Sequence, residues 1–249
     1  MQKKNGTMKI CIAQTSPNKG DIAKNIEQHV ALLNIAIAQQ ADMIIFPELS
    51  LTGYEPTLAN ELATTQEDKR LDVFQETSDK NKIVIGVGLP TKDNGQLFVS
   101  MIIFQPHKER LTYSKQYLYH TEVGIFTAGT EQLYLNVANN IVAPAICYEL
   151  SNPEHSGQAH KNNANIYIAS VLNSVTGVDG DMQKLSAIAA KYNMTTFLAN
   201  YVGTSGGYQC AGKSSVWNNK GELIGQLDDK NEGVLIYNTD TQDTITKMR

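Results

Sequence analysis

Several features that would mark a nucleic-acid-binding or membrane protein are missing from this 249-residue sequence. Lysine and arginine number 21 against 25 aspartates and glutamates, which gives a net charge of −4, and the basic residues are scattered. A dedicated nucleic-acid binder usually shows a basic footprint, so we expect no nucleic-acid partner. No stretch approaches the ~18 consecutive apolar residues that indicate a transmembrane helix, so we expect no membrane contact.

Cysteine is scarce as well. The three cysteines, Cys11, Cys147 and Cys210, are an odd number and lie far apart in the chain. The polar N-terminus has no apolar segment of the kind that secretory signals contain. We therefore expect a cytoplasmic protein with free thiols. A chain of this length can bury a full core, so it requires neither a disulfide nor a structural metal.

The sequence also lacks the motifs of the common metal and nucleotide sites. Its five histidines include His155 and His160, whose spacing is not that of metal ligands on one helix face, and no cysteine or carboxylate completes a zinc pattern. The glycines at 203, 206 and 207 do not form a phosphate-binding fingerprint. We predict neither a metal site nor a cofactor.

Short apolar runs alternate with amphipathic stretches along the whole chain, and 41% hydrophobic and 18% charged residues are typical of a globular protein. This pattern predicts an α/β fold with two sheets covered by helices. A single domain should comprise 8–249, and 1–7 would be an extension or an expression remnant. Strands are expected at 9–15, 42–47, 83–89, 97–104, 110–113, 141–147, 165–171, 195–200, 213–217 and 233–237. Helices are expected at 22–37, 69–80, 153–163 and 183–192.

Cys147 is the first candidate for chemistry. It ends the apolar stretch 141–147 and precedes a helix-start composition at 151–153. A nucleophile at such a turn is held out of the sheet, near backbone N–H groups that can bind an oxyanion. We expect the helix start and a nearby cation to lower the pKa of this thiol. A buried core cysteine is an equally good interpretation of the local sequence. Cys11 and Cys210 lack this context and should be structural.

Two charged residues that follow predicted strands are further candidates. Glu48 comes directly after 42–47, at the edge where α/β sheets bind ligands. Burial there would raise its pKa, as a general base working near neutral pH requires. Lys115 follows 110–113 and would place an ammonium against a thiolate and a developing oxyanion. Taken alone, Glu48 also fits a loop residue that caps a turn, and Lys115 a solvated surface lysine.

These three residues become informative when they are considered together and in order. The segments FPELSLTGY, YSKQYLYHTE and PAICYEL contain Glu48, Lys115 and Cys147. In this combination the chain resembles the nitrilase superfamily of carbon–nitrogen hydrolases, in its amidase-like branch. The likeness extends from KICIAQ near the start, through FLAN, to the late hairpin that contains Gly221.

The resemblance implies a four-layer α-β-β-α sandwich that forms a homodimer or a higher homo-oligomer. It implies that the Cys147 thiolate attacks a substrate carbon and forms a thioester, while Glu48 relays protons. Lys115 and the backbone N–H of Tyr148 would hold the oxyanion. Glu122 matches a supporting acidic residue that helps to position the lysine.

The resemblance favours a small amide as substrate, which would yield ammonia or an amine and a carboxylic acid. A nitrilase or an N-carbamoyl amide hydrolase with the same triad is an alternative. So are a glutaminase-type Cys–His–Glu site that uses His155 or His160, and a non-catalytic relative that binds ligands or partners. We expect the loops 53–63 and 173–181 to determine which acyl group is accepted.

The walls of the substrate pocket are harder to assign. Tyr54, Tyr119 and Asn173 are candidates for contact with the substrate. The chain departs from the family in two places that would line or support the pocket. Many members carry an Arg-Ala-x-Glu-Asn-like run at the place of residues 186–193, and this chain lacks it. Many also have a proline or tryptophan at the place of residues 171–174, and this chain has neither there. These departures leave the substrate open.

Overall fold

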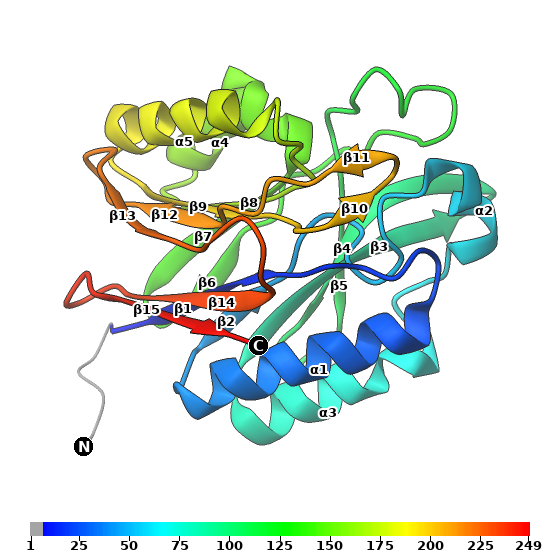
Figure 1. Cartoon of the computed structure of the whole chain (residues 1–249), viewed down its shortest axis with the longest axis horizontal. Coiled ribbons are helices and arrows are strands. Elements are labelled where there is room, and N and C mark those ends of the chain that lie inside the picture. The colour runs from blue at the N-terminus through cyan, green and yellow to red at the C-terminus, as the bar shows by residue number, and fades with distance from the viewer. Residues whose placement is uncertain (1–6) are drawn as a thin grey trace.

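The central strands of this protein are buried on both faces, and this produces its layered architecture. In β1 (Lys9–Gln14), Ile10 and Ile12 face one apolar cluster, whereas Cys11 and Ala13 face another. A strand that is apolar on both faces must be covered on both sides. The computed structural model, which describes residues 7–249, has two sheets packed face to face, with helices on the outside (Figure 1).

The first sheet has seven strands in the order β15-β14-β1-β2-β3-β4-β5. Neighbours β1, β2 and β3 are parallel, and the other pairs are antiparallel. Besides β1, its strands are β2 (Met43–Ile45), β3 (Val84–Asp93), β4 (Gln96–Phe104), β5 (Leu111–Ser114), β14 (Gly233–Asn238) and β15 (Thr244–Met248).

The second sheet has six strands in the order β13-β12-β9-β8-β7-β6, and β7, β8 and β9 are parallel. Its strands are β6 (Leu135–Val137), β7 (Asn140–Ile146), β8 (Ile166–Ser170), β9 (Thr195–Ala199), β12 (Ser215–Trp217) and β13 (Leu223–Gln226). A separate two-stranded ribbon consists of β10 (Thr204–Ser205) and β11 (Tyr208–Gln209).

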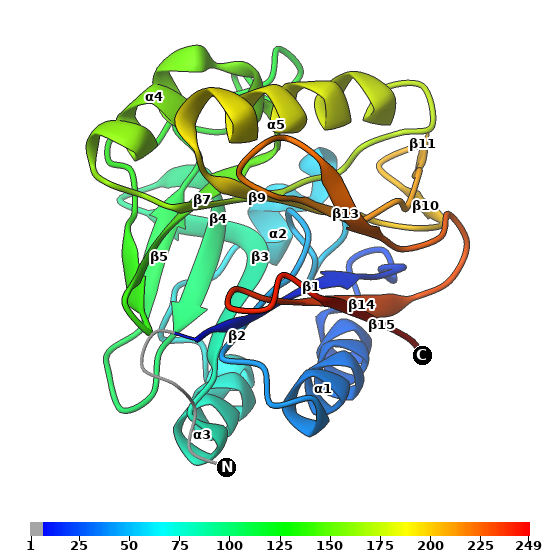
Figure 2. The ribbon, with the colours of Figure 1, turned by 90° about the vertical axis from the view of Figure 1, so that its left-hand side faces the viewer.

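Two pairs of helices form the outer layers (Figure 2). The pair α1 (Ile22–Ala38) and α3 (Asp72–Asn81) covers the first sheet, and the pair α4 (Pro153–Lys161) and α5 (Val178–Tyr192) covers the second. Shorter pieces are α2 (Ala59–Leu62) and the 3₁₀ helices η1 (Pro56–Leu58), η2 (Lys69–Leu71) and η3 (Cys147–Ser151). No helix within residues 7–249 is both long and apolar enough to span a membrane.

The predicted four-layer α-β-β-α sandwich in a single domain is therefore confirmed. One apolar cluster lies between the sheets, and the other two lie between each sheet and its helices. Residues 1–6 lie outside the described chain, so the expectation of an extension at 1–7 stays a prediction.

Several elements differ from the expectation. The expected helix at 183–192 begins earlier, at Val178, because glycines and aspartates with low helix propensity occupy its first turn and hide its start. The strand expected at 83–89 continues to Asp93 and pairs with β4 through a two-residue turn. Asn94 and Gly95 have positive φ angles of 46° and 79° there, which is the Asn-Gly hairpin signal.

The strand expected at 42–47 is shorter, because the chain turns away from the sheet before Pro47. Gly88 in β3 allows this turn to lie close to the sheet. Its N–H donates to Ser50 Oγ at 3.2 Å, and its carbonyl accepts from the N–H of Leu51 at 2.9 Å. A Cβ at Gly88 would lie 2.3 Å from Leu49 N and 2.7 Å from Pro47 O. This close approach holds the backbone around Glu48.

We expect Gly88→Ala to lower the free energy of unfolding by about 1–3 kcal/mol, because the added methyl must displace backbone rather than a mobile side chain. Gly180→Ala is the matched control. A Cβ at Gly180 meets nothing within 4 Å, and alanine in a helix is favoured over glycine by about 0.5–1 kcal/mol. Urea denaturation of both variants measures the two effects. If Gly88→Ala were as stable as the wild type, the turn around Glu48 would not depend on Gly88.

Candidate active site

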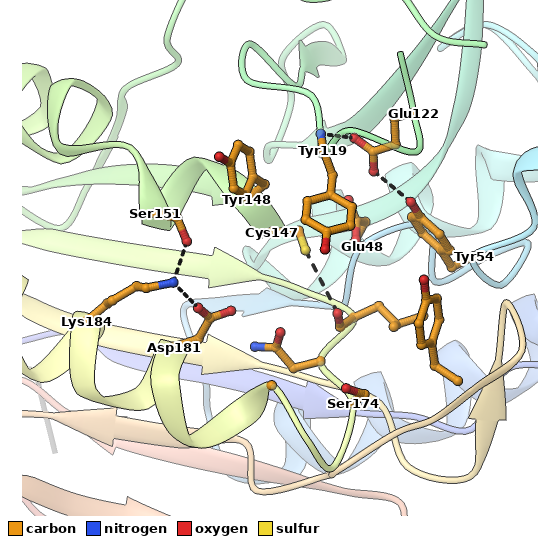
Figure 3. Close-up of a pocket in the computed structure, with 14 residues that line it drawn as sticks. Glu48, Tyr54, Tyr119, Glu122, Cys147, Tyr148, Ser151, Ser174, Asp181 and Lys184 are labelled. Atoms are coloured by element: carbon orange, nitrogen blue, oxygen red, sulfur yellow. Dashed lines mark hydrogen bonds and ion pairs between the residues drawn. The ribbon is translucent and has the colours of Figure 1, made fainter. Parts of the chain in front are cut away.

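The three candidate residues for chemistry meet at one pocket, although they lie far apart in the sequence. Glu48 follows β2, Lys115 follows β5, and Cys147 lies where β7 meets η3. A cavity of about 310 Å³ opens beside Glu48 and Cys147 (Figure 3). Lys115 does not line this cavity but contacts Glu48. The cavity is lined by Glu48, Tyr54, Tyr119, Glu122, Cys147, Tyr148, Ser151, Leu172, Asn173, Ser174, Gly177, Asp181, Lys184 and Tyr208.

Lys115 is fully buried between two carboxylates. Its Nζ donates to Glu48 Oε1 at 2.7 Å and to Glu122 Oε1 at 2.8 Å, and all three side chains are at most 1% exposed. Tyr54 donates from its hydroxyl to Glu122 Oε1 at 3.0 Å, and the backbone N–H of Tyr119 donates to Glu122 Oε2 at 2.8 Å. Glu122 is therefore fixed by three groups and in turn fixes the lysine.

Lys115 is charged in this setting. Burial alone lowers the pKa of the Lys115 ammonium, but Glu48, Cys147 and Glu122 raise it, and the net pKa shift is upward. Burial raises the pKa of Glu48 above its usual range, while Lys115 opposes that rise. A permanent cation beside a carboxyl group with a raised pKa is an arrangement suited to proton transfer near neutral pH.

Cys147 adopts a strained backbone conformation. Its φ angle is +47°, which non-glycine residues rarely adopt. Such strain occurs where a turn presents a nucleophile at the end of a strand. The thiol is partly exposed to the cavity, and its Sγ lies 3.9 Å from the carbonyl oxygen of Leu172.

The expected lowering of the Cys147 pKa is wrong for the resting site. Burial raises the pKa of this thiol most, Glu48 raises it further, and Lys115 only partly opposes both effects. The pKa therefore lies well above its usual range, and the resting thiol is protonated. A group that removes this proton is required before the sulfur can attack a substrate, and the Glu48 carboxyl is close enough to influence the thiol pKa.

Two buried polar atoms of pocket residues have no hydrogen-bond partner within residues 7–249. They are Glu48 Oε2 and Asn173 Nδ2. Buried polar atoms without partners are uncommon and cost free energy. One atom accepts and the other donates, so together they offer complementary contacts to a polar molecule in the cavity.

The residues predicted as pocket walls all line the cavity. Tyr54 is buried, whereas Tyr119 is 38% and Tyr148 is 43% exposed, and the rings of the last two meet edge to face at 5.5 Å. Of the loops expected to control selectivity, 53–63 contributes only Tyr54, and 173–181 contributes four lining residues.

Of the two stretches that depart from the family, one lines the pocket and the other does not. The stretch 171–174 supplies Leu172, Asn173 and Ser174 to the pocket, as expected. The stretch 186–193 supplies no lining residue, because it belongs to the later half of α5 and packs on the second sheet. The earlier half of that helix lines the cavity instead, through Asp181 and Lys184.

Neither His155 nor His160 lines the cavity into which Cys147 opens. Both ring nitrogens of His155 contact tyrosine hydroxyls, Tyr113 at 2.9 Å and Tyr167 at 2.8 Å. His160 stacks on Tyr192 with ring centroids 5.1 Å apart. The geometry therefore does not support a Cys–His–Glu site. Within residues 7–249, no group of three or more His, Cys, Asp or Glu side chains is arranged to hold a metal ion.

Glu149 is a site residue that the sequence interpretation missed. Its fully buried carboxyl accepts hydrogen bonds from the backbone N–H groups of Ile146 (2.6 Å) and Gln116 (2.5 Å) and from the Tyr113 hydroxyl (2.7 Å). It therefore ties the end of β7 to the end of β5. In the sequence it resembles an ordinary acidic residue in the first turn of a helix, so only its apolar surroundings could have marked it.

Comparisons with known proteins identify the family of this chain. The sequence pattern of the family described as carbon–nitrogen hydrolase matches residues 9–247. The chain belongs to this carbon–nitrogen hydrolase family. Curated relatives include a protein called hydrolase in agr operon from Staphylococcus aureus, 26% identical over 229 residues that cover 89% of this chain and 87% of that protein.

A glutamine-dependent NAD(+) synthetase from Acinetobacter baylyi is 27% identical over 230 residues, which are 88% of this chain but 42% of the synthetase. The chain thus spans about two fifths of the length of the synthetases that it matches. Among solved structures, a variant of the amidase from Nesterenkonia sp. AN1 has a TM-score of 0.85 and 23% identity, with 96% of this chain and 92% of that chain covered. In that amidase, the acetamide moiety of fluoroacetamide is bound covalently at the active-site cysteine.

Glu149 gives a prediction for the pH dependence of stability. Burial raises the pKa of Glu149 to about 7 from 4.5, although its hydrogen-bond donors oppose the rise. Between these pH values the folded protein binds more protons than the unfolded chain, so stability falls as pH rises. The free energy of unfolding should therefore fall by about 3 kcal/mol across this window relative to Glu149→Gln, which does not titrate.

Urea denaturation of both proteins at pH 4.5 and pH 8 measures this difference. The expected result is a wild-type stability that decreases relative to that of the variant as pH rises. A difference that does not change with pH would contradict the raised pKa of Glu149.

Proposed function

We propose that this protein hydrolyses the carbon–nitrogen bond of a small amide through a thioester on Cys147. The observation that carries this proposal is the buried contact of Lys115 with Glu48 and Glu122, beside a cavity into which Cys147 opens. A desolvated cation is costly to maintain, so a buried ammonium at this place is better explained by a role in the reaction than by a contribution to stability.

In the first half of the proposed reaction, Glu48 accepts the proton of the Cys147 thiol, and the sulfur attacks the amide carbon. A carbon–sulfur bond forms, and the carbonyl electron pair moves onto oxygen. Lys115 has three N–H donors, of which two bind carboxylates. The third and the backbone N–H of Tyr148 stabilise the developing negative charge. Glu48 then protonates the nitrogen, the carbon–nitrogen bond breaks, and ammonia leaves.

In the second half, water attacks the thioester and gives a proton to Glu48. The carbon–sulfur bond breaks, the acid leaves, and Glu48 returns the proton to the thiolate of Cys147. A single carboxyl group can act as base and then as acid when its pKa is raised, and burial raises the pKa of Glu48. Glu122 acts through the lysine, which it holds in place.

The unpaired polar atoms support an amide as the bound molecule. A primary amide has both N–H donors and a carbonyl acceptor, which complement Glu48 Oε2 and Asn173 Nδ2. Tyr54 and Tyr119 line the same cavity and would enclose the acyl chain. A nitrile has no N–H donor for Glu48 Oε2, so the amide is the better match.

The test is an assay of ammonia release from a panel of small amides, nitriles and N-carbamoyl amino acids. We expect release from amides, complete loss in Cys147→Ala, and a decrease of ~10²–10⁴-fold in Glu48→Gln, because proton transfer contributes that much to rate.

Cys11→Ala is the matched control for loss of a thiol. Cys11 lies in the cluster between the first sheet and its helices, away from the cavity, so this variant should retain activity. Full activity in either Cys147→Ala or Glu48→Gln would refute the proposed triad. Folding of each variant is checked by its melting temperature.

A further inference from the structure

The wall of the pocket that α5 and η3 form carries a second set of polar and charged residues. Lys184 and Asp181 come from the first half of α5, and Ser151 comes from the end of η3. Figure 3 places them on the opposite side of Cys147 from Glu122. All line the same cavity as Cys147, yet the proposed reaction uses none of them.

The three side chains form a small polar cluster. The Lys184 ammonium donates to Ser151 Oγ and to Asp181 Oδ1, each at 2.8 Å. The Lys184 side chain is 48% exposed, and that of Asp181 is 16% exposed. One N–H donor of the lysine remains, and Asp181 Oδ2 has no hydrogen bond with another residue in 7–249. The cluster can therefore bind a cation and an anion side by side.

The cavity that contains both this cluster and the thiol is large enough for more than the smallest amides. The cavity of about 310 Å³ has the volume of roughly ten molecules of liquid water. Tyr119 and Tyr148 form an aromatic pair on its wall. Such a wall suits the methylene groups of a short chain, and the polar cluster suits a charged group at the end of that chain.

The charges around the pocket favour a zwitterionic end group. When all are ionised, three carboxylates (Glu48, Glu122 and Asp181) meet two ammonium groups (Lys115 and Lys184). A substrate with a carboxylate alone would place negative charge beside Asp181. An α-amino acid has its ammonium and carboxylate on one carbon, so it can satisfy Asp181 and Lys184 together.

We propose that the pocket accepts an α-amino acid whose side chain ends in the amide, with its carboxylate on Lys184 and its ammonium on Asp181. This inference rests on the proposed amide hydrolysis at Cys147 and names the class of acyl group. Ser151 keeps the lysine directed into the pocket, and Asp181 and Lys184 act in binding rather than in bond breaking.

Four amides with the same five-carbon chain test the two charged contacts separately. L-glutamine has both charges, glutaramate lacks the ammonium, 4-aminopentanamide replaces the carboxylate by a methyl group, and pentanamide has neither charge. We expect kcat/KM to be highest for L-glutamine and about tenfold lower when either charge is missing, because each contact is a charge-assisted hydrogen bond at a partly exposed site.

Lys184→Met should reduce the ratio of kcat/KM between L-glutamine and 4-aminopentanamide toward one, mainly through KM. Asp181→Asn should do the same for L-glutamine against glutaramate. Lys191→Met is the matched control on the same helix, because the Lys191 ammonium lies over the Tyr192 ring, 4.9 Å from its centroid, outside the pocket. It should leave both ratios as in the wild type.

The outcomes separate this inference from the proposed function. If the wild type hydrolyses pentanamide as efficiently as L-glutamine, amide hydrolysis stands and the amino-acid site is overturned. An equal decrease of kcat/KM for all four amides in Lys184→Met also overturns it. Equal values of kcat/KM for glutaramate and L-glutamine in the wild type overturn the role of Asp181. If the folded wild type hydrolyses none of the four or any other amide, the proposed function itself fails.

Discussion

The rest of the site depends on a buried ammonium held between two carboxylates. Lys115 contacts Glu48 and Glu122 with no access to solvent, and removal of one partner from a buried ion pair typically costs about 3–5 kcal/mol. The lysine must therefore stay charged and in place, and its charge acts on both Glu48 and Cys147. In the proposed reaction, such a fixed cation would stabilise the developing negative charge without any rearrangement.

The ends of strands from both sheets bring the residues of this site together. The ion pair joins the end of β5 to the turn after β2 in the first sheet, while Cys147 comes from β7 in the second. Ser170 at the end of β8 donates to the carbonyl of Phe46 at the end of β2, at 2.7 Å, and so links the sheets beside the site. Glu149 adds a link between β7 and β5. The strained backbone at Cys147 is thus held from several directions.

The layered fold could be predicted because it depends on local patterns. Glu48, Lys115 and Cys147 were ambiguous one by one, and their order along the chain singled them out as candidates. Apolar runs identify buried strands, and Glu48 or Cys147 directly after such a run lies at a sheet edge. Contacts made by distant segments left no such signal. The burial of Lys115 requires two carboxylates, one 67 residues away in the sequence. Lys184 belongs to a helix whose start is hidden by weak helix formers, so its place on the pocket wall was not foreseen. The raised pKa of Cys147 depends on burial and on Glu48 together.

The central claim is that Cys147 carries the acyl group during the reaction. An activated ester such as p-nitrophenyl pentanoate tests it directly, because its leaving group needs no proton and the acyl-enzyme should accumulate. The protein would be mixed with the ester, quenched in acid and mapped by peptide mass spectrometry. The account predicts a pentanoyl group on the peptide that contains Cys147, formed with a burst of nitrophenol. A burst that leaves the acyl group on another residue, or a steady release without any acylated peptide, would contradict it.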